Sequence, residues 1–229
     1  MADLRPRVEG GNLAEEAGVN GVLFVGGAGP DPAAVADDIA EADVVAAADQ
    51  GLARAIAMGI EPDFVLGDFD SLDDTTLLDR FPPDRVLRFP TDKDETDAEI
   101  GLRLLAARGC DRVTLAGGGG GRLDHLLAIA ALFDRDRPPR RWVTDAEDVL
   151  LVEGEAYFDG WRGSTVSVFP LGDGASGLYS EGLRWPLEGL AFARGWAGIS
   201  NVADDDRVLV GVGRGRLLVV RSLREIRDA

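Results

Sequence analysis

Residues 44–59 run Val-Val-Ala-Ala-Ala-Asp-Gln-Gly-Leu-Ala-Arg-Ala-Ile-Ala-Met-Gly, and they contain the pattern that decides the fold. The continuous apolar run Val44–Ala48 predicts a strand that is buried on both faces. A helix is expected over Gly51–Met58, because Gly59 is a residue type that commonly ends helices. A strand followed by a short polar turn and a helix is the unit from which parallel sheets are built.

Further strands and helices alternate on both sides of this unit. We expect strands at 21–26, 63–66, 86–89 and 112–116, and helices at 32–42, 96–108 and 122–133. Asp31 and Pro32 suit the N-cap and the first position of the first helix. This alternation predicts an α/β domain with a mostly parallel, Rossmann-like sheet and helices on both faces.

The composition changes at residues 134–141, a charged segment with two prolines that has the character of a linker. Beyond it, short β-rich pieces at 149–152, 165–169, 177–179, 208–212 and 217–220 predict a small all-β, sandwich-like domain. The predicted organisation is a flexible leader at 1–20, an α/β domain at 21–137 and a β-sandwich domain at 138–229.

The charge balance limits the classes of partner. The chain has 41 acidic and 24 basic residues, a formal charge of -17, which weighs against binding to nucleic acid and to anionic membranes. A single cysteine, Cys110, excludes an internal disulfide framework. We see neither an apolar run of membrane length nor a signal peptide, and therefore expect a cytoplasmic protein.

Polar residues cluster directly after four of the predicted strands. The clusters are 49–51, 67–71, 91–97 and 117–125. In an open parallel sheet, ligands bind at the carboxyl ends of the strands, near the point where the strand order reverses. We therefore expect the four clusters to line one cleft.

Carboxylates dominate two of these clusters and suit a hard cation. Asp68 and Asp70 lie two residues apart in a turn, so that both can face one Mg²⁺ ion shared with substrate phosphates. The alternative is that they only cap the turn or the following helix. Asp94 and Asp97 could join the metal site, or Asp97 could cap the helix that follows it.

Residues 117–121 are five consecutive glycines before a helix, an arrangement that can bring backbone N–H groups to an anion. Arg122 could bind phosphate oxygens or form a surface salt bridge. Lys93 could contact phosphates or be a solvated loop residue. Asp124 could interact with the positive end of the helix dipole, and His125 could be a packed histidine or a catalytic base. Phosphoryl or pyrophosphoryl transfer needs mainly positioning and charge neutralisation, which these residues provide.

The motifs together resemble those of the thiamin pyrophosphokinase family over most of the chain. The matching segments are 67–71, 92–97, 120–125, 182–185 and 200–201. The resemblance implies an α/β domain that binds ATP and Mg²⁺, a β domain that helps to bind thiamin, and a homodimer with active sites between subunits. One departure is visible, since the family usually has Asp-Gly-Gly where this chain has Asp49-Gln50-Gly51.

The resemblance also implies roles for individual residues. The implied metal ligands are Asp68, Asp70 and Asp97. The implied catalytic residues are Asp70, Asp97 and Arg122. The implied ATP- and phosphate-binding residues are Asp49, Lys93, Asp94, Gly120, Gly121, Arg122 and Asp124. The implied thiamin contacts are Trp185, Ser200 and Asn201. Without the resemblance, Trp185 offers either a flat face for a thiazolium or pyrimidine ring or a core side chain, and Ser200-Asn201 would be a turn.

The expected activity is transfer of pyrophosphate from ATP to thiamin, which gives thiamin diphosphate and AMP. Either Asp97 or Asp70 would accept the hydroxyl proton. One alternative is a related diphosphokinase that acts on a pterin alcohol. The other is a non-catalytic thiamin or nucleotide sensor, toward which Gln50 is the only hint in the sequence.

Overall fold

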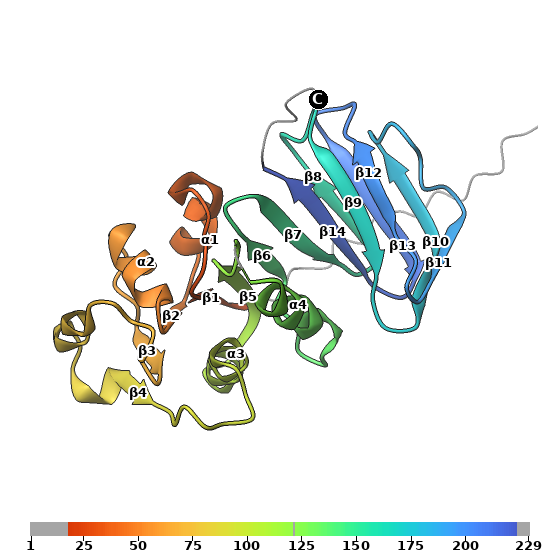
Figure 1. Ribbon diagram of the computed structural model, residues 1–229. Helices are drawn as coiled ribbons and strands as arrows, with labels where there is room; N and C mark the ends of the chain where they lie inside the picture. The colour runs from red at the N-terminus through yellow and green to blue at the C-terminus, as the bar shows by residue number, and fades with distance from the viewer. Residues whose placement is uncertain (1–17, 121, 224–229) are drawn as a thin grey trace, which may run out of the picture.

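The computed structural model describes residues 18–120 and 122–223. An α/β half and a β-sandwich half lie side by side (Figure 1). One sheet of ten strands runs through both halves in the order β12-β9-β14-β7-β6-β5-β1-β2-β3-β4. A second sheet of four strands, in the order β11-β10-β13-β8, covers its C-terminal part.

The first six strands of the chain form the parallel part of the large sheet. They are β1 (Val19–Phe24), β2 (Val44–Ala48), β3 (Phe64–Gly67), β4 (Val86–Arg88), β5 (Cys110–Ala116) and β6 (Arg141–Val143). The chain builds outward from β1 to β4 on one side and then returns to place β5 and β6 on the other. The strand order therefore reverses between β1 and β5.

Antiparallel strands continue this sheet and build the second one. They are β7 (Glu147–Val152), β8 (Glu155–Phe158), β9 (Thr165–Pro170), β10 (Gly174–Glu181), β11 (Leu190–Ala193), β12 (Gly198–Val202), β13 (Val208–Arg214) and β14 (Leu217–Ser222). The predicted fold class, a mostly parallel α/β sheet followed by an antiparallel sandwich, is confirmed.

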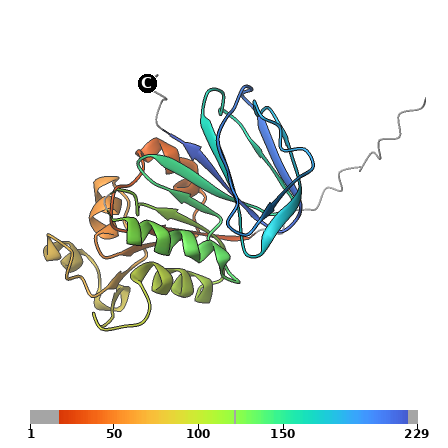
Figure 2. The same ribbon diagram turned by 45° about the vertical axis from the view of Figure 1, so that its right-hand side comes forward.

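Helices cover both faces of the parallel strands, with α3 and α4 on one side and α1 and α2 on the other (Figure 2). The α-helices are α1 (Ala36–Ala40), α2 (Gly51–Ala57), α3 (Asp97–Ala107) and α4 (Leu123–Ala131). Short 3₁₀ turns are η1 (Pro32–Val35), η2 (Thr75–Arg80), η3 (Pro83–Arg85) and η4 (Leu132–Asp134). No helix in the described part of the chain is long and apolar enough to cross a membrane.

The alternation of side chains along β1 explains why both faces need helices. Leu23 packs in a buried cluster with Ile100 and Leu105 of α3. Phe24, its neighbour in the chain, points to the opposite face and packs with Leu52 and Ala55 of α2. Successive residues of a strand face opposite sides of a sheet, so a strand without polar positions is stable only between two layers.

Two of the alternatives that the sequence left open are excluded by the structure. Asp97 does not cap α3, because Thr96 is the N-cap and forms a capping box with Glu99. Ser200 and Asn201 do not form a turn but lie in β12, where the register with β9 shifts between Gly198 and Asn201. The predicted leader lies mostly outside the described residues, and β1 already begins at Val19.

Candidate active site

A cleft of about 830 Å³ opens where the strand order reverses. Its lining comes from residues 25–132, at the carboxyl ends of β1, β2, β3 and β5 and from the loops and helices that follow them. Parallel strands all end at this edge of the sheet, so segments far apart in the sequence meet here. The cleft therefore unites the four polar clusters, as the sequence predicted.

The backbone around Asp49 is held in an unusual conformation. Asp49 has φ 46° and Phe69 has φ 62°, values that side-chain-bearing residues seldom adopt. The Asp49 Oδ1 atom accepts a hydrogen bond of 3.0 Å from the Phe69 N–H. Gly67 has φ 139°, and a Cβ atom there would stand only 1.9 Å from Asp49 Oδ1. The carboxylate of Asp49 thus occupies room that only glycine leaves open.

Four aspartates interact with one another at this edge. Burial, together with a hydrogen bond to Asp97 and the charge of Asp97, raises the pKa of Asp49 from 3.8 to about 7. The Asp70 N–H donates to Asp68 Oδ1 at 3.2 Å and lowers the pKa of Asp68. A hydrogen bond with Asp68 and the charge of Asp68 raise the pKa of Asp70. Carboxylates crowded in this way bind cations readily.

Lys93 brings a positive charge to these aspartates. Its Nζ lies 3.7 Å from Asp68 Oδ2 and 3.3 Å from Asp97 Oδ1, and its side chain is largely buried. Within residues 18–120 and 122–223, no three Asp, Glu, His or Cys side chains converge closely enough to enclose a metal ion. The three proposed metal ligands therefore do not form a closed cage, and Lys93 lies between two of them.

The glycine run is held in place by backbone hydrogen bonds that its composition does not indicate. The N–H groups of Gly117, Gly118 and Gly119 donate to the carbonyls of Val143, Gly26 and Ala28 at 2.9, 2.8 and 2.8 Å. Because these three N–H groups already donate to backbone carbonyls, they are not available to bind an anion as the sequence predicted. Gly120, at φ 69°, lines the cleft. Gly121 lies outside the described residues.

Side chains at the start of α4 flank the cleft from the open side. Arg122 Nε and Nη2 donate to the two oxygens of Asp124, so the surface ion pair that the sequence allowed is present. This pairing lowers the pKa of Asp124 to about 2. His125 lines the cleft and is exposed, so its interpretation as a packed histidine is wrong. Asp94 is exposed in its loop, and its binding role stays a prediction.

The three residues proposed to contact thiamin lie together in the C-terminal half. The Asn201 side chain accepts from the Trp185 N–H at 3.1 Å and donates to the Trp185 carbonyl at 2.7 Å. Asn201 is buried, whereas Trp185 is 56% exposed, so Trp185 is not a core residue. Ser200 has φ 61° and donates its N–H to Ser167 Oγ. These described residues are not part of the cleft lining in the same chain.

Sequence reasoning missed the glycine pair that lines the cleft after β1, whereas Gln50 belongs to the cluster 49–51 that was predicted to line it. Gly26 and Gly27 line it directly after the central strand β1, and a glycine pair at that place was the available signal. Gln50 also lines it, and its Nε2 donates to the Ser71 carbonyl at 2.7 Å. Gln50 thus links the start of α2 to the loop that carries Asp68 and Asp70.

A Rossmann-like sheet with a carboxylate-rich cleft and a glycine loop at its switch point is typical of nucleotide-dependent phosphotransferases. The chain belongs to the thiamin pyrophosphokinase family. The model of the family's catalytic domain matches residues 36–137, and the model of its vitamin B1 binding domain matches residues 153–217. The chain accordingly carries both functional domains of an enzyme that pyrophosphorylates thiamin at the expense of ATP.

Solved structures share the whole architecture. Thiamine pyrophosphokinase from Bacillus subtilis is 21% identical with a TM-score of 0.73, covering 90% of this chain and 99% of that one. Thiamin pyrophosphokinase from Geobacillus thermodenitrificans is 25% identical with a TM-score of 0.69, covering 91% and 99%. The yeast enzyme is 14% identical with a TM-score of 0.65, covering 90% and 87%. No curated protein sequence matches the chain significantly.

Proposed function

We propose that the cleft at the carboxyl ends of β1, β2, β3 and β5 is where ATP and thiamin react. The observation that carries this proposal is the meeting of Asp49, Asp68, Asp97 and Lys93 in one cleft at the switch point. The thiamin hydroxyl oxygen bonds to the β-phosphorus of ATP while the bond from that phosphorus to the α,β-bridging oxygen breaks. AMP leaves with the bridging oxygen, and thiamin diphosphate forms.

The donor set fits Mg²⁺. Asp68 and Asp70 supply hard oxygens that face each other closely enough to share a hydrogen bond. The Asp97 Oδ1 atom is buried and accepts no hydrogen bond from residues 18–120 or 122–223, although Lys93 Nζ lies 3.3 Å from it. Mg²⁺ is commonly held by one or two carboxylates together with substrate phosphates and water, so a closed protein cage is not required. Asp68 and Asp70 would hold the ion, and Asp97 would complete the site.

The bound ion would neutralise charge on the transferred group. Lys93, placed between Asp68 and Asp97, contributes a second positive charge beside the phosphates. Arg122, at the open side of the cleft, exchanges Asp124 for a phosphate oxygen when ATP enters. Asp97 accepts the hydroxyl proton in preference to Asp70, because Asp97 lines the cleft and Asp70 does not.

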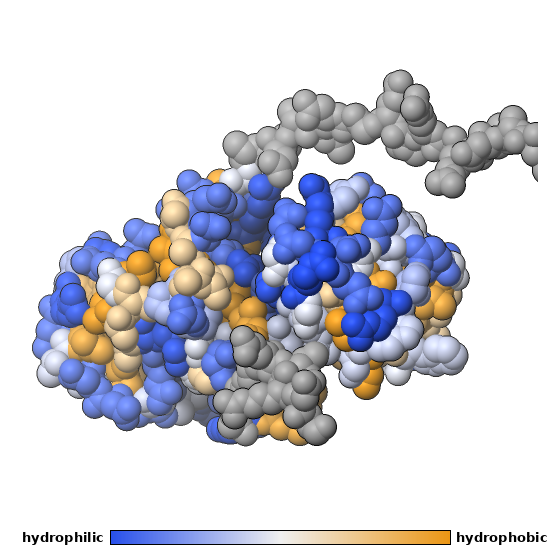
Figure 3. Space-filling model, turned by 90° about the horizontal axis from the view of Figure 1, so that it is seen from above, coloured by the Kyte–Doolittle hydropathy of each residue, from blue (hydrophilic) through white to orange (hydrophobic). Residues whose placement is uncertain are grey.

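Thiamin binding is best explained by a homodimer. The cleft of one chain is lined by its α/β half, whereas Trp185, Ser200 and Asn201 lie in its sandwich. A second subunit could bring these residues over the cleft. Hydrophilic surface dominates the view from above, with apolar patches on both halves (Figure 3). Exposed apolar side chains that a partner could cover are Leu123, Leu127, Trp185, Trp196 and Ile199.

Asp70→Asn tests the metal assignment. The exposed Asp70 side chain adds little to folding, so this variant should retain the wild-type melting temperature and lose most turnover. Asp84→Asn, at an exposed position in η3, is the matched control and should turn over normally. The assay measures AMP release as a function of Mg²⁺ concentration. Near-normal turnover and an unchanged Mg²⁺ requirement in Asp70→Asn would exclude Asp70 as a ligand.

A further inference from the structure

The turn between β6 and β7 packs against the glycine loop (Gly117–Gly120). A Cβ atom on Gly119 would lie 2.8 Å from Thr144 Cβ and 2.5 Å from Asp145 Oδ1. Gly119 also exchanges two backbone hydrogen bonds with Ala28, of 2.7 and 2.8 Å. The loop is therefore in contact with both the turn and the segment after β1, with no room for a side chain at position 119.

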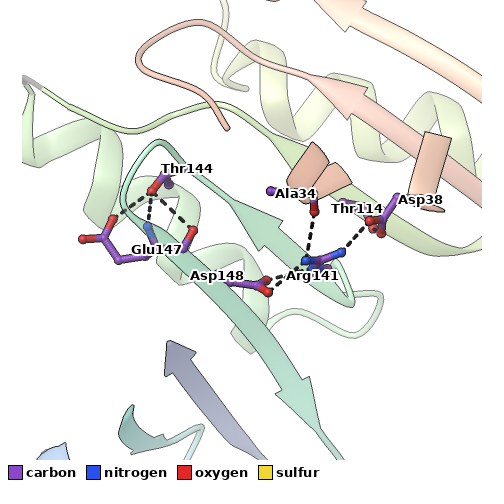
Figure 4. A network of polar contacts seen from close by, with 7 residues as sticks. All are labelled: Ala34, Asp38, Thr114, Arg141, Thr144, Glu147 and Asp148. Atoms are coloured by element: carbon purple, nitrogen blue, oxygen red, sulfur yellow. Dashed lines mark hydrogen bonds and ion pairs between the residues drawn. The ribbon is translucent and has the colours of Figure 1, made fainter. Parts of the chain in front are cut away.

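One buried hydroxyl organises this turn. Thr144 is 1% exposed, and its Oγ1 accepts from the N–H groups of Ala146 and Glu147 at 3.1 and 2.9 Å. The same hydroxyl donates to Glu147 Oε2 at 2.8 Å (Figure 4). Without the hydroxyl, two backbone donors inside the turn lose their acceptor, which costs more than the average hydrogen bond. The shape of the turn therefore depends on the Thr144 hydroxyl.

The hairpin is anchored at its other end as well. Arg141 of β6 binds both oxygens of Asp148 at 2.8 Å and also pairs with Asp38 of α1. Arg141 also donates to the Ala34 carbonyl at 3.1 Å, and this hydrogen bond connects the hairpin to η1 (Figure 4). With the strand pairing fixed and Arg141 clamped, a change at Thr144 must be absorbed by the turn itself and by the glycine loop that it touches.

We propose that Thr144 is a positioning residue for the nucleotide. It acts through the β6–β7 turn, which fixes how far the glycine loop, with Gly120 at its end, projects into the cleft. This inference rests on the proposed function, since it assumes that the nucleotide phosphates lie against Gly120. Trp142 supports the same loop, because its Nε1 donates to the Gly117 carbonyl at 2.7 Å.

The test compares Thr144→Val, which has the same shape without the hydroxyl, with Thr144→Ser, which keeps it. Thr144→Val should raise the KM for ATP about 3- to 10-fold and leave the KM for thiamin unchanged, the range that corresponds to about one lost hydrogen bond. Thr144→Ser should restore the wild-type KM. The matched control is Ser180→Ala, which removes a buried hydroxyl of β10 that accepts from the Leu187 N–H at 3.0 Å, away from the turn and the cleft.

A merely structural role of Thr144 would lower the melting temperature of Thr144→Val, as expected for Ser180→Ala, and leave the KM for ATP at the wild-type value in both variants. That result would overturn the inference. If Thr144→Val does not fold, Glu147→Ala removes the side-chain acceptor of the hydroxyl proton and leaves it only the longer contact of 3.4 Å to the Glu147 carbonyl, which should raise the KM for ATP in the same direction. Failure of the proposed function would look different, because the wild-type protein itself would then form no AMP and no thiamin diphosphate.

Discussion

Replacing Gly67 with alanine adds one methyl group, and the folded variant should have lost most of its activity. The Gly67 φ of 139° is unfavourable for any residue with a side chain, and holding such a conformation costs about 1–3 kcal/mol. An alanine Cβ atom would also stand 1.9 Å from Asp49 Oδ1, far inside contact distance. The Asp49 carboxylate must then move and give up its hydrogen bond from Phe69, which costs about 1.5–3 kcal/mol for a charged acceptor.

Gly59→Ala is the matched control for this change. Gly59 also has positive φ, 76°, but a Cβ atom there meets no other atom within 4 Å. Its substitution therefore costs only backbone strain, about 1–2 kcal/mol. It lies beyond the end of α2, outside the cleft lining, and should leave turnover unchanged.

The assay is urea unfolding combined with steady-state turnover, measured at a temperature where both variants are folded. We expect the free energy of unfolding of Gly67→Ala to be lower than that of Gly59→Ala by about 1–3 kcal/mol. We also expect Gly67→Ala to lose at least 90% of kcat/KM, because displacement of Asp49 removes about 1.4 kcal/mol or more of transition-state stabilisation. Folded Gly67→Ala with normal kcat/KM would refute the argument that Asp49 must occupy this space.

Three further predictions follow from buried polar groups. Arg141→Met should lower the free energy of unfolding by about 3–5 kcal/mol in urea, because it leaves Asp148 buried without its partner. Its control is Arg140→Met, which breaks an exposed ion pair with Glu153 and should cost less than about 1 kcal/mol. Trp142→Phe removes a buried donor to the glycine loop and should cost about 1–3 kcal/mol, measured by urea unfolding. Asp49 binds its proton more tightly in the folded state, with a pKa of about 7 against 3.8, so its contribution to stability is present at pH 4 and lost as the pH rises through 7. In EDTA, the melting temperature should therefore fall less between pH 5 and pH 8 for Asp49→Asn than for wild type.

The arrangement of the α/β half was predictable from local patterns. The apolar run at 44–48 is β2 with the bounds that the sequence predicted, and the strand beginning at Val86 is likewise found at β4. Such runs carry their own signal, since a strand between two helical layers needs an apolar residue at every position. The cleft was predictable for the same reason, because polar residues after parallel strands must meet at one edge.

The sandwich strands were harder to find. Strands β8, β11 and β12, and the parallel strand β6, were not predicted, since each is short and has half-exposed or exposed positions. Their pairing depends on distant strands, which no local pattern encodes. The hydrogen bonds of the glycine loop were equally hidden. A run of glycines has no side chains to show that Val143, Gly26 and Ala28 take up its N–H groups.

The measurement that tests the central claim most directly is product formation by the purified protein with ATP, Mg²⁺ and thiamin. We expect AMP and thiamin diphosphate in equal amounts, with neither formed when thiamin or Mg²⁺ is omitted. ADP in place of AMP would contradict pyrophosphoryl transfer. No product from folded protein that binds ATP would contradict the assignment of thiamin as the substrate of this cleft, and the same assay with a pterin alcohol would then be the comparison to make.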